Sequence, residues 1–209
     1  MLPEGWIKTT LGEVAQISSG GTPDRSNPNY WGGDIPWVTT GEIRFNTITD
    51  SAEKITEAGL RNSSAKIFSA GTLLMAMYDQ GKTRGQVAKL GIDAATNQAC
   101  ASIKTEDECD IDYLFQFLTS QYMAIRELGN SGTQQNLNGS LIKGIPLALP
   151  PKAEQIRIAQ MVTAWDNAIA LNKAQIQTLV LEKRTLMQDL MTGKRRVHIP
   201  FAGDLANLA

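Results

Sequence analysis

The sequence contains few of the residues that build metal centres and nucleophilic active sites. Its 209 residues include two cysteines, Cys100 and Cys109, and one histidine, His198. These cysteines form no CxxC pair, so neither a disulfide framework nor a zinc site is credible. A Ser–His–Asp or Cys–His mechanism is nearly excluded, because the histidine lies in the tail. Cys100 stands in an apolar run, and we expect it to be a small core residue.

Long apolar runs are also missing. No run approaches the roughly 20 residues that a membrane-spanning helix needs. We find no charged and then apolar leader that ends at a small-residue cleavage site. The hydrophobic fraction of 42% is ordinary for a globular protein. We therefore expect a cytoplasmic protein.

The chain has no excess of positive charge, and its formal net charge is −1. Residues 1–151 carry 12 Lys and Arg against 16 Asp and Glu, a balance of −4, whereas residues 152–197 carry 8 against 4, a balance of +4. The first part thus lacks the positive field that drives non-specific binding to nucleic acid. If it binds DNA, it needs a local basic patch or the help of a partner.

A long helix is predicted over residues 151–193, followed by a tail over residues 194–209. Pro151 suits the first helical position, Glu154 complements the helix dipole, and Gly193 can adopt the left-handed conformation that ends a helix. Steps of three and four define a seam that is apolar at eight of ten positions and resembles a coiled coil. The seam residues are Ile158, Val162, Trp165, Ile169, Asn172, Ile176, Leu179, Lys183, Leu186 and Leu190.

A helix of this length extends about 60 Å at 1.5 Å per residue, which is longer than a small domain is wide. Such a helix needs a partner to cover its seam. We expect the polar seam residues Asn172 and Lys183 to set register and partner choice, because a buried polar group costs stability unless it is matched. The alternative is a helix that folds back on its own domain.

Residues 1–150 are predicted to form one mixed domain of the α+β class. We expect a helix around residues 57–61 and a second, core-packing helix over residues 112–128. The strand at 145–149 should lie at a sheet edge, since Pro146 cannot donate to a ladder. The other expected strands are residues 14–18, 35–39, 73–77, 87–90 and 99–103. The acidic residues 106–112 suggest either a metal site or the start of a helix, and the helix dipole explains them better.

The turn at residues 78–86 is the first candidate for contact with DNA. Its composition presents Gln80, Lys82, Arg84 and Gln86, and these side-chain types suit guanine and adenine edges in the major groove. The alternative is a solvated loop whose charges serve solubility.

A second group of candidates for DNA contact comes from two other loops. Its members are Thr39, Thr40, Gln134, Gln135 and Asn136. The amides of the last three could equally hydrogen-bond the backbone of their own loop.

Several short motifs stand in a fixed order along nearly the whole chain. They are residues 2–6 (LPEGW), 20–23 (GGTP), 27–38 (NPNYWGGDIPWV), 83–85 (TRG), 95–98 (ATNQ), 132–137 (GTQQNL), 149–155 (LPPKAEQ) and 190–197 (LMTGKRRV). In this order they resemble the specificity (S) subunits of Type I restriction–modification systems.

The resemblance implies a target-recognition domain over residues 1–150 and a conserved spacer helix over residues 151–193. In this family, two such repeats usually occur in one chain, and their helices pack antiparallel between two domains that each read half of a split DNA site. The subunit holds methyltransferase (M) subunits, and restriction (R) subunits join the assembly. S-adenosylmethionine, ATP and Mg are then expected on those partners, and this chain is expected to be non-catalytic and to hold no metal.

The sequence departs from the family pattern because it carries a single repeat. It is either a natural half-length subunit or an expressed half, and we expect a homodimer to restore two recognition domains. A different class of function is a scaffold or decoy that binds M subunits without reading DNA. A third possibility is an enzyme that acts alone, which methyl transfer to DNA without partners would reveal.

We predict a two-fold dimer formed through the 151–193 helix, because its apolar seam needs to be covered. Light scattering at tens of micromolar should report twice the mass of the chain, and a stable monomer would refute the prediction. A two-fold dimer should bind palindromic half-sites around a fixed spacer, since the symmetry of a protein is mirrored in its site.

Overall fold

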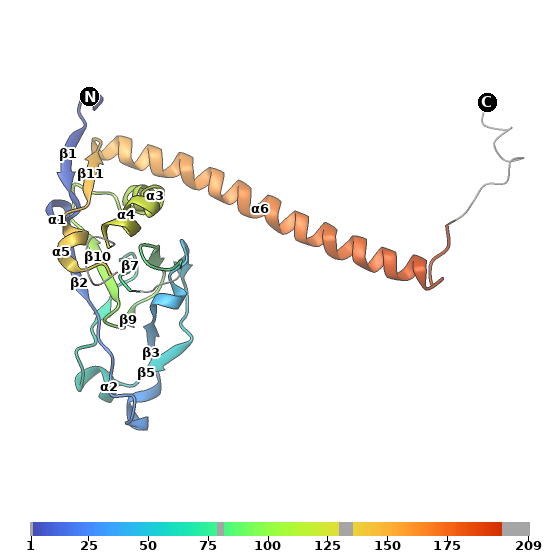
Figure 1. Cartoon of the computed structure of the whole chain (residues 1–209), viewed down its shortest axis with the longest axis horizontal. Helices are drawn as coiled ribbons and strands as arrows, with labels where there is room; N and C mark the ends of the chain where they lie inside the picture. The colour runs from blue at the N-terminus through green and yellow to red at the C-terminus, as the bar shows by residue number, and fades with distance from the viewer. Residues whose placement is uncertain (1, 79–81, 130–135, 198–209) are drawn as a thin grey trace, which may run out of the picture. The chain divides into compact units, whose positions relative to one another are not determined.

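A domain of three small sheets precedes a 40-residue helix, α6 (Lys152–Met191), in the computed structural model (Figure 1), which describes residues 2–78, 82–129 and 136–197. The chain divides into two compact units, residues 1–160 and residues 161–209, so the first two turns of α6 belong to the domain. The expected fold class, a mixed domain followed by a long helix, is confirmed.

The centre of the domain is a five-stranded sheet. Its strands, in spatial order, are β2 (Ala15–Ser19), β10 (Cys100–Thr105), β7 (Leu73–Ala76), β8 (Val87–Leu90) and β4 (Thr47–Ile48). All four residues of β7 are buried, with Leu73 and Met75 in one core cluster and Leu74 and Ala76 in another. Both faces of the sheet are therefore covered, which explains why β7 reads as an unbroken apolar run.

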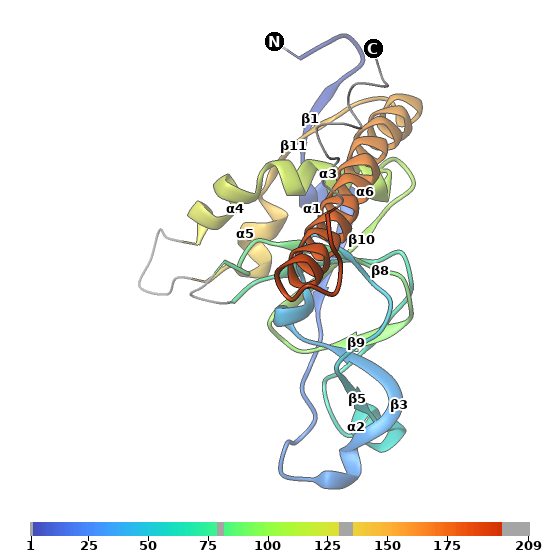
Figure 2. The same ribbon diagram turned by 90° about the vertical axis from the view of Figure 1, so that its right-hand side faces the viewer.

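A four-stranded sheet with short flanking helices lies at one end of the domain (Figures 1 and 2). These elements are β5 (Glu53–Ile55), β3 (Trp31–Val38), β9 (Ala94–Thr96), β6 (Ile67–Phe68), η1 (Pro28–Tyr30), η2 (Thr40–Glu42) and α2 (Glu57–Arg61). Trp37, Ile55, Ala65 and Ala95 form its core. Strands β5, β6 and β9 are two or three residues long, and so short a run has no periodicity that a sequence can display.

A two-stranded sheet joins the ends of the domain, because β1 (Ile7–Thr10) pairs antiparallel with β11 (Pro146–Leu149). Pro146 pairs with Thr10 at the end of this ladder, so the expected edge position is confirmed. The short helices α1 (Leu11–Val14) and α5 (Gly139–Lys143) lie beside this sheet, and neither was predicted from the sequence.

The helix predicted over residues 112–128 is two helices. These are α3 (Ile111–Ser120) and α4 (Tyr122–Leu128), separated at Gln121. The Thr119 and Ser120 hydroxyls donate to the carbonyls of Phe115 and Phe117, and such back-bonding competes with a continuous helix. At the start of α3, Asp110 Oδ1 accepts bonds from two backbone N–H groups at 3.0 Å, which supports the helix-start interpretation of the acidic run.

One buried amide joins the first turn of α6 to the domain. Gln155 is 1% exposed, and its Nε2 donates to the carbonyls of Glu108 (2.9 Å) and Pro150 (2.8 Å). Its Oε1 accepts from the Asp110 N–H at 2.7 Å. Beside it, Trp6 Nε1 donates to Glu154 Oε2 at 3.2 Å. The N-terminal and helix-start motifs therefore meet in space.

The seam residues of α6 differ in exposure along the helix. Ile158 is half-buried and packs against the hydrophobic core of the domain, so part of its surface is already covered, and its place in a dimer seam stays a prediction. From residue 161 to residue 188 every side chain of the helix is exposed. The helix ends at Met191, and Gly193 follows with φ of +72°, as predicted for the residue after a helix. Over the described residues, no helix is both long and apolar enough to span a membrane.

Replacing Gln155 by Ala should lower the free energy of unfolding by about 2–4 kcal/mol. The change leaves three backbone groups without their partner, one of them in a buried bond and two in partly buried bonds, and each costs up to about 1–3 kcal/mol before relaxation. Urea denaturation at fixed protein concentration measures the effect, with the exposed Gln160→Ala as the matched control. A loss below about 1 kcal/mol would contradict this account of the junction.

Candidate nucleic-acid interface

Three loop segments that are distant in sequence meet around two aromatic rings. The rings of Phe45 and Tyr122 lie edge to face, with centroids 5.2 Å apart. The Phe45 N–H donates to the Val87 carbonyl at 2.9 Å, and the Tyr122 hydroxyl donates to the Lys82 carbonyl. We call residues 39–46, 82–87, 122–128 and 136–138 the loop cluster.

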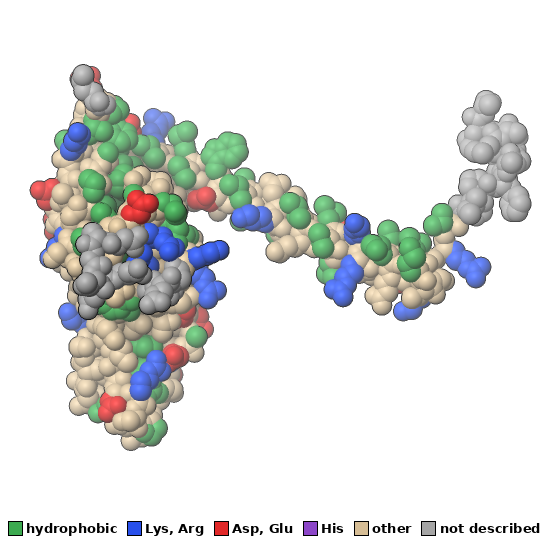
Figure 3. All heavy atoms as spheres, viewed as in Figure 1, with side chains coloured by type: hydrophobic (Ala, Val, Ile, Leu, Met, Phe, Trp, Pro, Cys, Tyr) green, Lys and Arg blue, Asp and Glu red, His purple; other side chains and the backbone are tan. Residues whose placement is uncertain are grey.

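The fourth segment of the loop cluster is tied to β7. The Leu137 N–H donates to the Met77 carbonyl at 3.0 Å, and Leu137 is fully buried. Its neighbour Asn136 is exposed. In Figure 3, Lys and Arg side chains gather beside the grey residues on this part of the domain, so the acidic domain does carry a local basic region.

Of the first group of candidates, Lys82 keeps the expected exposure and Gln86 keeps it only in part. Lys82 is exposed and Gln86 is half-buried. Gln80 lies outside the described residues. The DNA-contact role of this group stays a prediction.

Arg84 is buried, which corrects the expectation that the turn presents it to solvent. Its residue is 5% exposed, and a Cβ placed on Gly129 would lie 3.5 Å from its Nη1 atom. The guanidinium therefore sits at the C-terminal end of α4, where a cation complements the helix dipole. Its neighbour Gly85, at φ of +82°, packs against Ile125 and Arg126. Folding of distant α4 onto the turn buries this arginine.

The second group of candidates also contains both exposed side chains and side chains that are engaged within the domain. The Thr39 hydroxyl donates to Glu42 Oε2 at 3.0 Å and its N–H donates to the same oxygen at 2.7 Å, as the cap of η2. Thr40 is half-buried beside it, and Asn136 is exposed. Gln134 and Gln135 lie outside the described residues. Thr39 thus has a structural use for its side chain.

Arg44 is an exposed residue of the loop cluster that the sequence did not single out. Its Nε donates to the Gly41 carbonyl at 2.7 Å, and its N–H donates to Asn46 Oδ1 at 2.8 Å. Phe45 between them has φ of +55°, a conformation that costs energy for a non-glycine residue and often marks a functional site. The packing of the Phe45 ring stabilises this turn. The position has no glycine, which is the residue that would have indicated a positive φ in the sequence.

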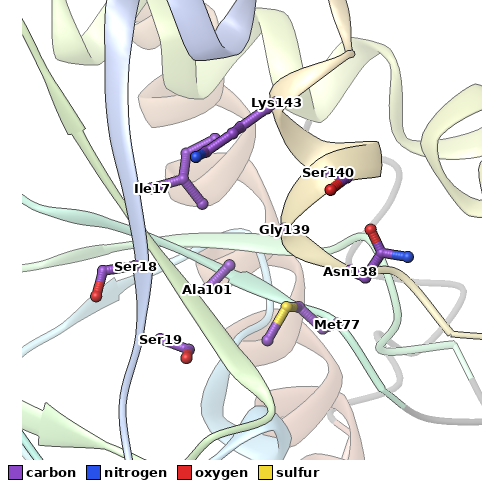
Figure 4. Close-up of a pocket in the computed structure, with 9 residues that line it drawn as sticks. All are labelled: Ile17, Ser18, Ser19, Met77, Ala101, Asn138, Gly139, Ser140 and Lys143. Carbon is purple, nitrogen blue, oxygen red and sulfur yellow. The ribbon is translucent and has the colours of Figure 1, made fainter.

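A pocket of about 430 Å³ opens between β2 and α5 (Figure 4). It is lined by Ile17, Ser18, Ser19, Met77, Ala101, Asn138, Gly139, Ser140 and Lys143. Hydroxyl, amide and ammonium groups can donate hydrogen bonds to a polar ligand such as a phosphate. Among the described residues, the lining holds no carboxylate, imidazole or thiol, so these side chains offer no general acid–base pair of the usual kind.

The two thiols are poor nucleophiles. Burial raises the pKa of Cys100 to about 12 and that of Cys109 to about 11, because an apolar environment disfavours the thiolate. Cys100 is fully buried, as expected. Within residues 2–78, 82–129 and 136–197, no group of three His, Cys, Asp or Glu residues is placed to hold a metal ion.

The motifs that carry the family resemblance mostly build the scaffold. Trp37 Nε1 donates to the Gly21 carbonyl at 2.9 Å, and the Gly21 N–H donates to the Thr96 carbonyl at 2.9 Å. A Cβ on Gly20 would lie 2.0 Å from that same carbonyl oxygen, so glycine is required there. The Thr22 hydroxyl bonds Gln98. These motifs therefore lock β3, β9 and the first loop together.

Residues 3–181 match the model of the Type I restriction modification DNA specificity domain. The chain belongs to this family.

Its relatives include full specificity subunits. The chain is 28% identical to the Type I restriction enzyme MjaIX specificity subunit of Methanocaldococcus jannaschii, over 88% of this chain and 43% of the relative. It is 27% identical to the HindI specificity subunit of Haemophilus influenzae, over 92% of this chain and 42% of the relative. The chain thus spans less than half the length of the curated relatives it matches.

Solved structures share the fold. The HsdS subunit from Thermoanaerobacter tengcongensis superposes with a TM-score of 0.64 at 21% identity, covering 84% of this chain and 41% of that chain. The S subunit from M. genitalium superposes with a TM-score of 0.61 at 16% identity, covering 88% and 45%.

Replacing Arg84 by Ala should lower the free energy of unfolding by about 2–3 kcal/mol, because a buried side chain that packs on α4 is lost. The exposed Lys82→Ala should change it by less than about 0.5 kcal/mol. Denaturant titration of both variants measures the contrast. If the two variants are equally stable, the packing role assigned to Arg84 is wrong. Any loss of DNA affinity in Arg84→Ala, expected at about 1–3 kcal/mol, would then report a DNA contact and not a loss of folding stability.

Proposed function

We propose that this chain is a DNA sequence-recognition subunit of a Type I restriction–modification complex, and that it reads one half of a bipartite site. The observation that carries the proposal is the family match over residues 3–181, which covers both the domain and most of α6. The loop cluster supports it, because the Phe45–Val87 and Tyr122–Lys82 hydrogen bonds and the contact between the Phe45 and Tyr122 rings bring the segments of exposed Arg44 and Lys82 together.

The proposal includes partner subunits. M subunits would bind S-adenosylmethionine and methylate the site, R subunits would use ATP and Mg, and this chain would be non-catalytic. Exposed apolar side chains outside the seam of α6 support docking, since a two-helix pair covers only one stripe of each helix. These side chains are Met161, Leu171, Val180, Leu181 and Met187.

A second copy of the chain would supply the other recognition domain. Trp165, Ile176 and Leu179 are exposed seam residues that support this homodimer, since their burial would stabilise the pair.

The balance of −4 over residues 1–151 gives the scaffold alternative its support. An acidic domain binds DNA weakly by itself, because the phosphate backbone repels it. A subunit that reads DNA in the M complex and a decoy that never reads it would therefore behave alike when alone, and they must be compared with the partner present.

We predict specific DNA binding in the presence of M subunits, with affinity that falls as salt rises. Sequencing the methylated sites of a host that carries both proteins identifies the cognate DNA for the titration. The double change Arg44→Ala and Lys82→Ala should weaken binding about tenfold or more and reduce the slope of log affinity against log salt by about 1 per lost phosphate contact.

The exposed Lys54→Ala on β5 is the control, because it removes one positive charge from a residue outside the loop cluster. Normal assembly with M subunits without DNA affinity would support the decoy function instead. Unchanged binding by the double variant would place the recognition surface elsewhere on the domain.

A further inference from the structure

The exposed seam of α6 contains two polar residues whose burial restricts how the helix can pair. Asn172 and Lys183 stand eleven residues apart among apolar seam positions. Asn172 Nδ2 donates to the Ala168 carbonyl of its own helix at 2.8 Å, so its Oδ1 is the atom that can accept from a cation. A pairing that buries either residue against an apolar side chain leaves a polar group unmatched and is destabilised.

We propose that two copies of α6 pair antiparallel in the register that places Asn172 of one copy opposite Lys183 of the other. In this register two residues of opposite copies face each other when their sequence numbers add to 355, and we call this number the sum of the register. The proposal rests on the proposed function for its premises that the partner is a second copy and that the helices pair antiparallel, as the family resemblance implies, and it adds the register. By two-fold symmetry the dimer contains this amide–ammonium pair twice.

In this register the three other seam layers that lie within α6 on both copies are apolar on both sides, and Val162 faces the partner's Gly193 just beyond the helix end. Ile176 faces the partner's Leu179, and Ile169 faces the partner's Leu186. Trp165, which is 71% exposed in the single chain, faces the partner's Leu190. The two polar residues are therefore matched with each other, and the apolar residues with one another.

Neighbouring registers lack this match. Sliding one helix by seven residues to a sum of 348 sets Asn172 against the partner's Ile176 and Lys183 against the partner's Trp165. The same shift brings Lys173 next to its own copy at the two-fold axis, where like charges repel. A parallel pair in register would bring the two Lys183 side chains together in the seam.

The packing of Ile158 favours the same register independently. Ile158 is half-buried against the core of its own domain, so only part of its surface is open to a second helix. With a sum of 355, Ile158 would face residue 197 of the partner, which lies beyond the end of α6 at Met191. Ile158 is therefore not required in any layer of the helix pair. With a sum of 348 it would have to face the partner's Leu190.

An open groove lies along the last turns of the helix. It has a volume of about 710 Å³, and Leu179, Lys183 and Leu186 are among its lining residues. Arg195 also lines it, because the chain turns back after Gly193 and the Arg195 N–H donates to the Asp189 carbonyl at 3.1 Å. The proposed register seats the partner's Ile176, Asn172 and Ile169 in this groove.

The register also sets the distance between the two halves of the dimer. Residue 161 of one copy would lie level with residue 194 of the other, so the two copies of residue 161 are about 50 Å apart along the pair. A shift of one heptad changes this separation by about 10 Å, which corresponds to about 3 base pairs of DNA. The polar pair would thus determine which spacer length the dimer accepts.

A charge swap tests the register in the whole chain. Asn172→Lys should raise the dimer dissociation constant about tenfold or more, because it faces Lys183, and the second change Lys183→Glu should restore it to within about threefold. Within one helix the two positions are three turns apart and cannot pair. Sedimentation measures the constant, circular dichroism checks helix content, and Gln177→Lys, off the seam, is the control. A double variant that dimerises more weakly than Asn172→Lys would overturn the register.

Disulfide trapping is the second test and does not depend on affinity. Asn172→Cys with Lys183→Cys should give a covalent dimer on mild oxidation, while Asn172→Cys with Ile176→Cys should not. Trapping of the second pair, or of neither pair in a proven dimer, would refute the register, and a monomer would refute the partner. A correctly trapped dimer that fails to bind DNA with M subunits would count against the proposed function and leave the register standing.

Discussion

The buried Gln155 amide is the interaction on which the relation between domain and helix depends. It bonds backbone groups of Glu108, Asp110 and Pro150, so the loop before α3 and the residue that follows β11 converge on one side chain. A buried amide tolerates little displacement, because each lost bond leaves a polar group unsatisfied. The start of α6 is therefore fixed to the domain, and Ile158 and Ala159 are drawn into the same core.

Most residues of the family motifs are not the residues that would read DNA, although Asn136, in the motif 132–137, belongs to both groups. Gly20, Gly21 and Trp37 make close contacts that fix β3 and β9. The Trp37 Nε1–H and the Gly21 N–H and carbonyl are engaged in hydrogen bonds within the domain. Exposed Arg44, Lys82 and Asn136 sit on loops that this scaffold positions. Such a division lets the loops change while the frame is kept, which is how a common fold can serve many targets.

The helix combines two requirements that differ in physical origin. In the proposed dimer, its apolar seam would supply the free energy of association without specifying orientation, because hydrophobic burial is non-directional. Asn172 and Lys183 would add direction, since an amide and an ammonium are tolerated in a seam only where they are matched. Together they would set both the affinity and the register of the helix pair.

The long helix, its ends and the buried strand at β7 could be predicted from the sequence, because periodicity, capping residues and apolar runs are local properties. The fold class followed from them. Only the tertiary structure showed that Arg84 is buried, that Ile158 packs on the domain and that Arg44 stands on a strained turn at Phe45. Each of these depends on a segment far away in the chain, such as α4 closing over Gly85, and exposure cannot be read from neighbours in sequence alone.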